Sequence, residues 1–154
     1  MGGLEQKLTA DLKEALKAGG MERAGVLRLL IAALRNRSIE KRGKGKSPEL
    51  TDAEGVEVLQ GELKKRRDAA PLFRKGGRED LARAEEREAA AVKEYLPAML
   101  EGDALRDAVR AALARSGAKE FPHAMKDAMA ALKGKADGAA VAEAVREELA
   151  RQNQ

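Results

Sequence analysis

Side chains that commonly carry out catalysis are scarce in this chain of 154 residues. It contains no cysteine, and His123 is its single histidine, so a thiolate nucleophile and a two-histidine metal site are both excluded. None of the three serines, Ser38, Ser47 and Ser116, lies in a nucleophile-elbow sequence. Residues 43–47 (GKGKS) lack the spacing and the preceding strand of a phosphate-binding loop. We therefore expect no catalytic residue, no metal ligand and no cofactor.

Basic side chains offer a different chemistry, the binding of phosphate groups. Residues 1–77 contain 17 basic and 11 acidic side chains, residues 78–96 contain 4 and 6, and residues 97–154 contain 9 of each. The excess positive charge therefore lies in the first half, in two runs: Arg35, Arg37, Lys41, Arg42, Lys44 and Lys46, then Lys64, Lys65 and Arg67. Two interpretations stay open: a phosphate-binding surface, or solvated faces that keep the protein soluble.

Aromatic side chains limit the kind of nucleic acid that this chain could bind. Phe73, Tyr95 and Phe121 are the only ones, and the first two fall on apolar helix stripes. Proteins usually bind single-stranded RNA and DNA by stacking bases on aromatic rings, which are too few here. Any nucleic acid would be recognised by its backbone and shape, and we expect RNA rather than DNA.

The elements that must position these side chains are all predicted to be helices. Alanine, leucine, glutamate, lysine and arginine dominate, aromatic residues make up 2%, and apolar residues recur every three to four positions. The expected helices span about residues 4–18, 21–42, 52–75, 81–96, 103–116, 122–132 and 138–150. We predict a four-helix domain over residues 1–96 and a small three-helix domain over residues 97–154. The second helix should be central, because more of its circumference is apolar.

Local signals set several of the expected helix ends. Thr51 and Glu54 have the spacing of a capping box, and Asp137 is the expected N-cap of the last helix. Pro122 can open a helix, because the first turn has no hydrogen bond to lose. Pro71 lies inside the third helix, so we expect a kink or a break near residue 67.

Two charged residues occupy positions where the helix stripes predict apolar ones. They are Arg66 in the third helix and Glu88 in the fourth. The two could meet as a partly buried ion pair between these helices. Alternatively, Arg66 could extend along the apolar surface and bring its guanidinium to solvent at the rim. The sequence leaves both alternatives open.

No stretch of the sequence has the apolar length of a signal peptide or a membrane span. Charged residues interrupt the leucines in the first twenty positions, and no later run reaches the ~20 apolar residues that a span requires. A chain without cysteine suits a reducing compartment. We expect a cytoplasmic protein with no membrane partner.

Four motifs, in order along the chain, resemble the GatB/YqeY family of small bacterial proteins: residues 63–73 (LKKRRDAAPLF), 77–81 (GREDL), 94–97 (EYLP) and 133–138 (KGKADG). The resemblance implies a helical N-terminal domain. It also implies a C-terminal domain similar to the tail of the B subunit of the tRNA-dependent amidotransferase, a carbon–nitrogen ligase that uses glutamine as amide donor. In that enzyme the tail is associated with tRNA recognition. The chemistry belongs to a separate catalytic portion, which nothing in this chain resembles.

The resemblance makes Lys133 and Lys135 the family-derived candidates for contact with RNA. Local charge adds Lys119 and Lys126, because residues 115–135 contain five basic and two acidic side chains. The resemblance therefore places the contact within residues 97–151, whereas net charge places it within residues 35–75.

Three hypotheses follow for the function. In the first, a non-catalytic protein binds tRNA or another folded RNA as an accessory to tRNA-dependent amidation or translation. In the second, a helical groove binds a translation or aminoacylation protein, and the basic runs serve only solubility. In the third, the chain completes an amidotransferase in trans, although by itself it is not expected to be an enzyme.

Overall fold

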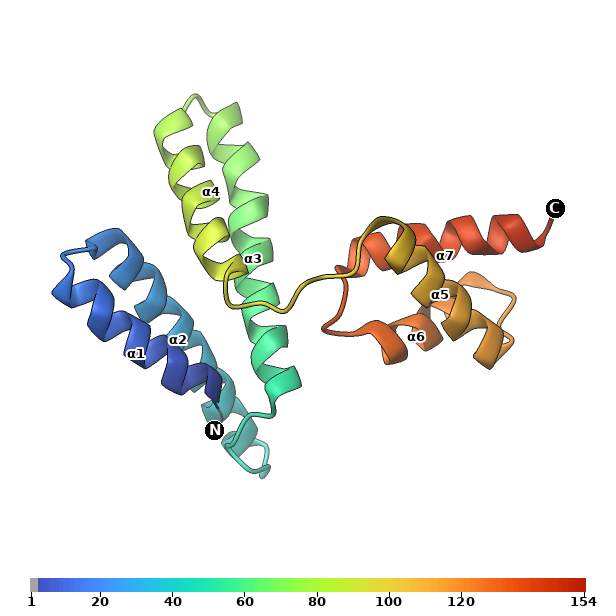
Figure 1. Ribbon diagram of the computed structural model, residues 1–154, viewed down its shortest axis with the longest axis horizontal. Helices are drawn as coiled ribbons and strands as arrows, with labels where there is room; N and C mark the ends of the chain where they lie inside the picture. The colour runs from blue at the N-terminus through green and yellow to red at the C-terminus, as the bar shows by residue number, and fades with distance from the viewer. Residues whose placement is uncertain (1–2) are drawn as a thin grey trace. The chain divides into compact units, whose positions relative to one another are not determined.

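Seven α-helices make up the computed structural model, which describes residues 3–154 (Figure 1). No strand occurs in that range, so the prediction of an all-α protein is confirmed. The helices form two compact groups, α1–α4 and α5–α7, and the chain passes from one to the other between Leu96 and Pro97. Their bounds are α1 (Gly3–Lys17), α2 (Met21–Gly43), α3 (Asp52–Lys75), α4 (Glu79–Lys93), α5 (Gly102–Ser116), α6 (Phe121–Leu132) and α7 (Gly138–Gln152).

Several helix ends follow the local signals in the sequence. At the start of α3, the Glu54 N–H donates to Thr51 Oγ1 at 3.1 Å and the Thr51 N–H donates to Glu54 Oε1 at 3.0 Å, which confirms the capping box. The Ala140 N–H donates to Asp137 Oδ2 at 3.1 Å, so Asp137 is the N-cap of α7, as predicted. Pro122 lies in the first turn of α6.

One expectation about helix ends is wrong, and one of the two alternatives at Pro71 is excluded. Of the kink or break expected near residue 67, the break does not occur, because α3 continues as a helix through Pro71. Proline removes one backbone hydrogen bond, but Ala70 beside it is buried and α3 packs along α4, which holds the surrounding turns in place. The second difference is that α4 ends at Lys93, three residues before the expected end at Leu96.

The N-terminal unit consists of two helical hairpins. α1 packs on α2 and α3 packs on α4, while α2 also contacts α3 and α4, so α2 is the central helix, as predicted (Figure 1). Leucine side chains fill much of the core, and the fully buried ones are Leu8, Leu27, Leu30, Leu34 and Leu59. Burying each such side chain contributes about 1.5–3 kcal/mol.

The C-terminal unit has a core of its own, to which each of its three helices contributes. α5, α6 and α7 contact one another pairwise. The fully buried side chains include Val109, Leu113, Ala124, Ala128, Val141 and Val145. The Leu100 N–H donates to the Lys135 carbonyl at 2.8 Å, which ties the segment before α5 to the loop between α6 and α7. One side of α6 therefore faces the core, and the opposite side is exposed.

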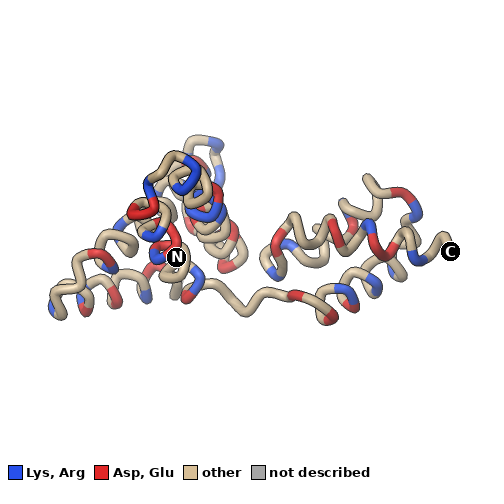
Figure 2. Tube along the Cα trace, turned by 90° about the horizontal axis from the view of Figure 1, so that it is seen from above, with Lys and Arg blue, Asp and Glu red and all other residues tan. Residues whose placement is uncertain are grey.

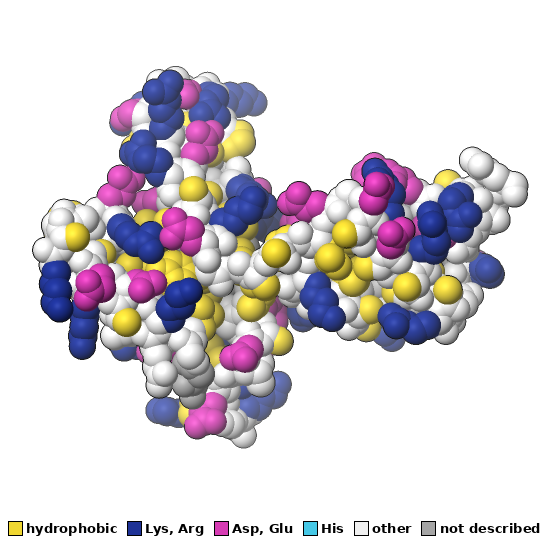
Figure 3. Space-filling model, viewed as in Figure 1, with side chains coloured by type: hydrophobic (Ala, Val, Ile, Leu, Met, Phe, Trp, Pro, Cys, Tyr) yellow, Lys and Arg dark blue, Asp and Glu magenta, His cyan; other side chains and the backbone are white. Residues whose placement is uncertain are grey.

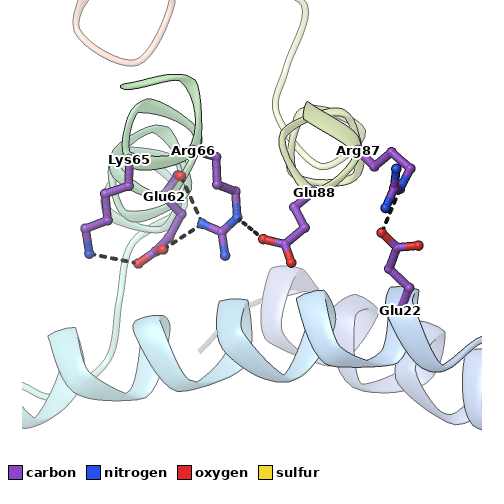
Figure 4. Close-up of polar contacts among 6 residues, drawn as sticks. All are labelled: Glu22, Glu62, Lys65, Arg66, Arg87 and Glu88. Atoms are coloured by element: carbon purple, nitrogen blue, oxygen red, sulfur yellow. Dashed lines mark hydrogen bonds and ion pairs between the residues drawn. The ribbon is translucent and has the colours of Figure 1, made fainter. Parts of the chain in front are cut away.

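Arg66 is buried in the N-terminal unit, where its side chain is surrounded by carboxylates. Its Nε lies 3.3 Å from Glu88 Oε2 on α4, and its Nη1 donates to Glu62 Oε2 at 2.9 Å (Figure 4). The predicted ion pair between α3 and α4 is confirmed, and at 6% exposure Arg66 does not extend to the rim. Nearby, Arg87 Nε donates to Glu22 Oε1 at 2.9 Å and joins α4 to α2.

Candidate nucleic-acid interface

Three of the six basic residues in the run at the end of α2 are engaged by acidic side chains. Each of three candidates pairs with a carboxylate on a helix that packs against α2. The pairs are Arg35–Glu5 (Nε–Oε1, 3.0 Å), Arg37–Glu57 (Nη2–Oε1, 3.6 Å) and Lys41–Glu54 (Nζ–Oε1, 2.9 Å). These predicted RNA contacts therefore join α2 to α1 and α3, and their positive charge is compensated within the protein.

Glu54 illustrates how firmly such a carboxylate is engaged. It accepts hydrogen bonds from the Thr51 N–H at 3.0 Å and from Lys41 Nζ at 2.9 Å. These two bonds lower the pKa of Glu54 to about 2, and the bond from Thr51 has the largest effect. Lys41 Nζ also donates to the Glu49 carbonyl, so this lysine fastens the loop between α2 and α3.

The second basic run, on α3, is paired along its own helix. Lys64 Nζ lies 2.8 Å from Asp68 Oδ2, and Lys65 Nζ lies 3.4 Å from Glu62 Oε1. Arg67 is exposed and forms no ion pair with any residue in the range 3–154. Only one of the three predicted contacts in this run therefore has an uncompensated charge.

The two basic runs approach each other at a shallow depression of about 300 Å³ between α2 and α3. Arg37 and Lys65 border it, together with the acidic residues Glu40, Glu57 and Glu62. Figure 2 shows basic and acidic positions interspersed along the helices of this unit, and Figure 3 shows the same mixture on its visible face. Packing thus produces a surface of mixed charge there.

Three cations at the end of α2 are different. Arg42, Lys44 and Lys46 are exposed, and none of them forms an ion pair within the described part of the chain. We call these three residues the basic loop. It is the densest uncompensated positive charge among the N-terminal candidates.

The candidates of the C-terminal unit lie on α6 and in the loops at its two ends. Lys126 and Lys133 are seven residues apart, with Ala130 between them, so they project from the same side of the helix, and all three are exposed. Lys119 precedes α6 and Lys135 follows it, and both are exposed. We call the four lysines the α6 face. Lys119, Lys126 and Lys135 form no ion pair with residues 3–154, so their positive charge is not compensated within the described part of the chain.

The equal numbers of basic and acidic residues in the C-terminal unit conceal a separation of charge. Residues 115–135 carry a net charge of +3, and the rest of residues 97–154 carry −3. Outside residues 115–135, three of the four arginines are paired with carboxylates: Arg106, Arg110 and Arg151. Arg106 Nη1 lies 2.7 Å from Asp103 Oδ1, and its Nε lies 3.4 Å from Glu147 Oε2. Lys119, Lys126 and Lys135 are therefore accessible positive charge in a unit with no net charge.

A buried carboxylate, Glu148, ties α5 to α7. It accepts hydrogen bonds from Arg151 Nη2 at 2.6 Å and from Arg110 Nε at 3.3 Å. These bonds lower the pKa of Glu148 to about 2, and the bond from Arg151 has the largest effect. The sequence analysis missed this cluster, although a signal was present: Glu148 shares the apolar face of α7 with Val145, as Arg66 shares the apolar face of α3.

Tyr95 fastens the end of the N-terminal unit. Its hydroxyl donates to Asp11 on α1 and accepts a hydrogen bond from Arg23 Nη2 on α2 at 3.0 Å, while Arg23 Nη1 lies 3.0 Å from Glu94 Oε2. Burial, and then the bond to Asp11, raise the pKa of Tyr95 to about 12. The apolar stripe predicted the burial of the ring but not these polar contacts.

His123 borders a shallow depression of about 420 Å³ together with Lys119, Glu120 and Asp127. Within residues 3–154, no group of three or more histidine, aspartate or glutamate side chains is placed to hold a metal ion. No helix in the described range has the length and apolar character needed to cross a membrane. What the α6 face offers chemically is positive charge for anionic groups.

Seven helices within residues 3–154, arranged in two groups, and a row of exposed lysines define a small all-α protein whose accessible chemistry is electrostatic. The model of the YqeY-like protein family matches residues 5–149, so the chain belongs to this family. The resemblance carried by the motifs is thereby confirmed. An uncharacterized protein of Schizosaccharomyces pombe is 30% identical over 94 residues, which cover 61% of this chain and 72% of that protein.

Proposed function

We propose that this protein is a cytoplasmic, non-catalytic binder of folded RNA, with tRNA as the favoured partner, and that it contacts the RNA through the α6 face. Its role would be that of an accessory to tRNA-dependent amidation or translation. One observation carries the proposal: Lys119, Lys126 and Lys135, on and beside α6, are each exposed and form no ion pair within residues 3–154. The N-terminal candidates are, by contrast, mostly engaged by carboxylates.

Phosphate is the ligand chemistry that fits an exposed row of lysines. α6 has 12 residues, so at 1.5 Å per residue it extends about 18 Å, which is long enough to face several phosphates. A lysine ammonium is a point charge and lacks the planar fork with which arginine recognises base edges. The α6 face therefore favours contact with the nucleic-acid backbone over readout of base sequence.

The scarcity of aromatic surface favours folded over single-stranded RNA. Phe121, the aromatic residue of α6, is half-buried, and the Arg146 guanidinium lies 4.8 Å from its ring centroid. A half-buried ring already covered by a side chain offers little surface for a base to stack on. The turn at residues 133–138, which resembles the amidotransferase tail, favours tRNA among folded RNAs.

The test measures binding of unfractionated tRNA to the full-length chain between 50 and 200 mM salt, for example by fluorescence anisotropy. Four phosphate contacts at the α6 face would contribute about −3.6 to the slope of log K against log salt, or roughly 100-fold loss of affinity over this range. The triple variant K119Q/K126Q/K135Q, called the α6 variant, should flatten that slope by about 2.7. It should also weaken binding at 100 mM salt by at least about tenfold.

A matched control removes the same number of charges elsewhere. K13Q/K75Q/K93Q, called the control variant, replaces three exposed lysines of the N-terminal unit that form no ion pair within residues 3–154. It should retain the wild-type slope and affinity. Equal losses in both variants would attribute binding to net charge and contradict the α6 face. Binding that ignores salt would contradict the phosphate mechanism, and a DNA duplex should bind more weakly than tRNA.

Catalysis is assigned to other proteins in this proposal. Glutamine-dependent amidation of a misacylated tRNA by the purified chain should be undetectable. Turnover by the chain alone would replace the proposal with the third hypothesis, an enzyme that acts in trans.

A protein partner is the second candidate, and exposed apolar side chains of the N-terminal unit favour it. Leu29, Ile39 and Leu72 are 52%, 65% and 69% exposed. Single exposed apolar side chains are common on protein surfaces, so this observation carries less weight than the row of lysines. Capture from cell extract with and without ribonuclease distinguishes the two candidates. Partners that survive ribonuclease but are lost with I39E would favour a protein.

A further inference from the structure

We infer that the chain makes a second RNA contact, at the basic loop of the N-terminal unit; this inference rests on the proposed function. Arg42, Lys44 and Lys46 place three cations within five residues, with no acidic residue among them. The neighbouring candidates at the end of α2 are paired with carboxylates. The positive charge of this region that is available to an anion is therefore concentrated in the basic loop.

The backbone of the basic loop is held in a defined turn. The Gly45 N–H donates to the Arg42 carbonyl at 3.0 Å, and the Lys46 N–H donates to the Lys41 carbonyl at 2.9 Å. Gly45 has φ 73°, in the left-handed region that glycine adopts without strain. Because the turn is already formed, a bound RNA would not have to order this backbone, which reduces the entropic cost of binding.

Lys41, which precedes the basic loop, is held by acceptors at and just before the start of α3. Its side chain is 16% exposed, and its ammonium lies 2.9 Å from Glu54 Oε1 and also donates to the Glu49 carbonyl. Glu54 in turn accepts the Thr51 N–H as part of the helix cap. Glu49 is the acidic residue of residues 43–51, and its carboxylate forms no ion pair within the described part of the chain. The loop is thus closed by one lysine, while its other cations face solvent.

A purely structural role for the basic loop makes a different prediction. Cations near the C-terminal end of a helix interact favourably with the helix dipole, and this alone could account for Arg42 in the last turn of α2. Lys75 and Lys93 occupy the same kind of position at the ends of α3 and α4. The control variant removes both, so it reproduces a loss of dipole compensation without touching the basic loop.

Two contacts on one chain reinforce each other. The basic loop and the α6 face belong to separate compact units, which are linked by residues 94–101 outside any helix. Once one contact has formed, the second becomes intramolecular, which raises affinity if a single RNA can reach both. A folded RNA presents phosphates over a wide surface, whereas a short duplex presents few. The inference therefore predicts that tRNA binds more tightly than a short RNA duplex, and that the difference depends on the basic loop.

The experiment compares R42Q/K44Q/K46Q, called the loop variant, with the wild type and the control variant, using full-length protein and unfractionated tRNA. The loop variant should flatten the salt slope by about 2.7 and weaken binding at 100 mM salt by at least about tenfold. The charge-conserving R42K/K44R/K46R should restore both values. The thermal midpoint of all variants should match the wild type, because these side chains are exposed.

The outcomes separate this inference from the proposed function. If the loop variant behaves like the control variant while the α6 variant loses its slope, the inference is overturned and the proposed function stands. If only the loop variant loses its slope, the inference stands and the α6 assignment is wrong. If the wild type does not bind tRNA, both fail.

Discussion

The two units of this protein differ in how far their basic side chains are paired with carboxylates. Residues 1–96 hold 21 basic and 17 acidic side chains, yet most of the predicted N-terminal contacts are paired with carboxylates. Residues 97–154 hold nine of each, yet Lys119, Lys126 and Lys135 are exposed and form no ion pair within the described residues. Net charge therefore measures how much charge a unit carries, while pairing determines how much of it a partner can reach.

The largest expected effect is on the free energy of unfolding, and it tests whether a buried ion pair stabilises the N-terminal unit. R66M leaves the half-buried carboxylate of Glu88 without its cation and leaves Glu62 with only the exposed Lys65, and should destabilise this unit by about 3–5 kcal/mol. Chemical denaturation followed by circular dichroism measures the loss. The triple variant R66M/E62L/E88L removes the stranded charges and should recover much of the stability. A loss below about 1 kcal/mol for R66M would mean that the ion pair is not important for the fold.

The next effect tests whether charge in the C-terminal unit is available for binding. K133E/K135E reverses two charges of the α6 face and should weaken tRNA binding about 100-fold at 100 mM salt. Because both side chains are exposed, the free energy of unfolding should change by less than about 0.5 kcal/mol. K13E/K93E is the matched reversal in the other unit and should leave affinity near the wild type. Equal losses in the two reversals would remove the distinction between the units.

A smaller loss of folding stability is expected at acid pH. It concerns Glu148, the buried carboxylate of the C-terminal unit. The pKa of Glu148 is lowered to about 2 in the folded unit, chiefly by Arg151, from an unfolded value near 4.5. Its contribution to stability is therefore complete above about pH 4.5 and is lost as the pH falls toward 2. Unfolding midpoints measured between pH 6 and 2 should show this decline, and E148Q should flatten it. An unchanged acid profile in E148Q would place the decline at other carboxylates.

The smallest effect should come from an exposed pair on α3. K64Q breaks the contact between Lys64 and Asp68, which lie one helical turn apart and are both solvent-exposed. Such pairs contribute about 0.3–0.5 kcal/mol, so the unfolding midpoint should barely move, and the salt slope of tRNA binding should stay unchanged. A flattened slope would place Lys64 in the RNA contact and weaken the contrast between the units.

Much of the helical framework could be predicted because its signals are local. The capping box of Thr51 and Glu54 and the cap at Asp137 depend on residues three positions apart, and both occur as expected. Arg66 and Glu88 could be matched because each interrupts an apolar stripe on a neighbouring helix. Pro71 does not break α3, which was one of the two alternatives, because proline acts against a helix locally while packing against α4 supports it from outside.

The sequence by itself determined the seven helices within residues 3–154, the family and the supply of lysines and arginines. Only the tertiary structure decided which of those cations are compensated. Arg35 meets Glu5 across 30 positions of sequence, and Arg110 meets Glu148 across 38. An ion pair depends on the distance between two charges in space, and that distance follows from which helix faces pack together.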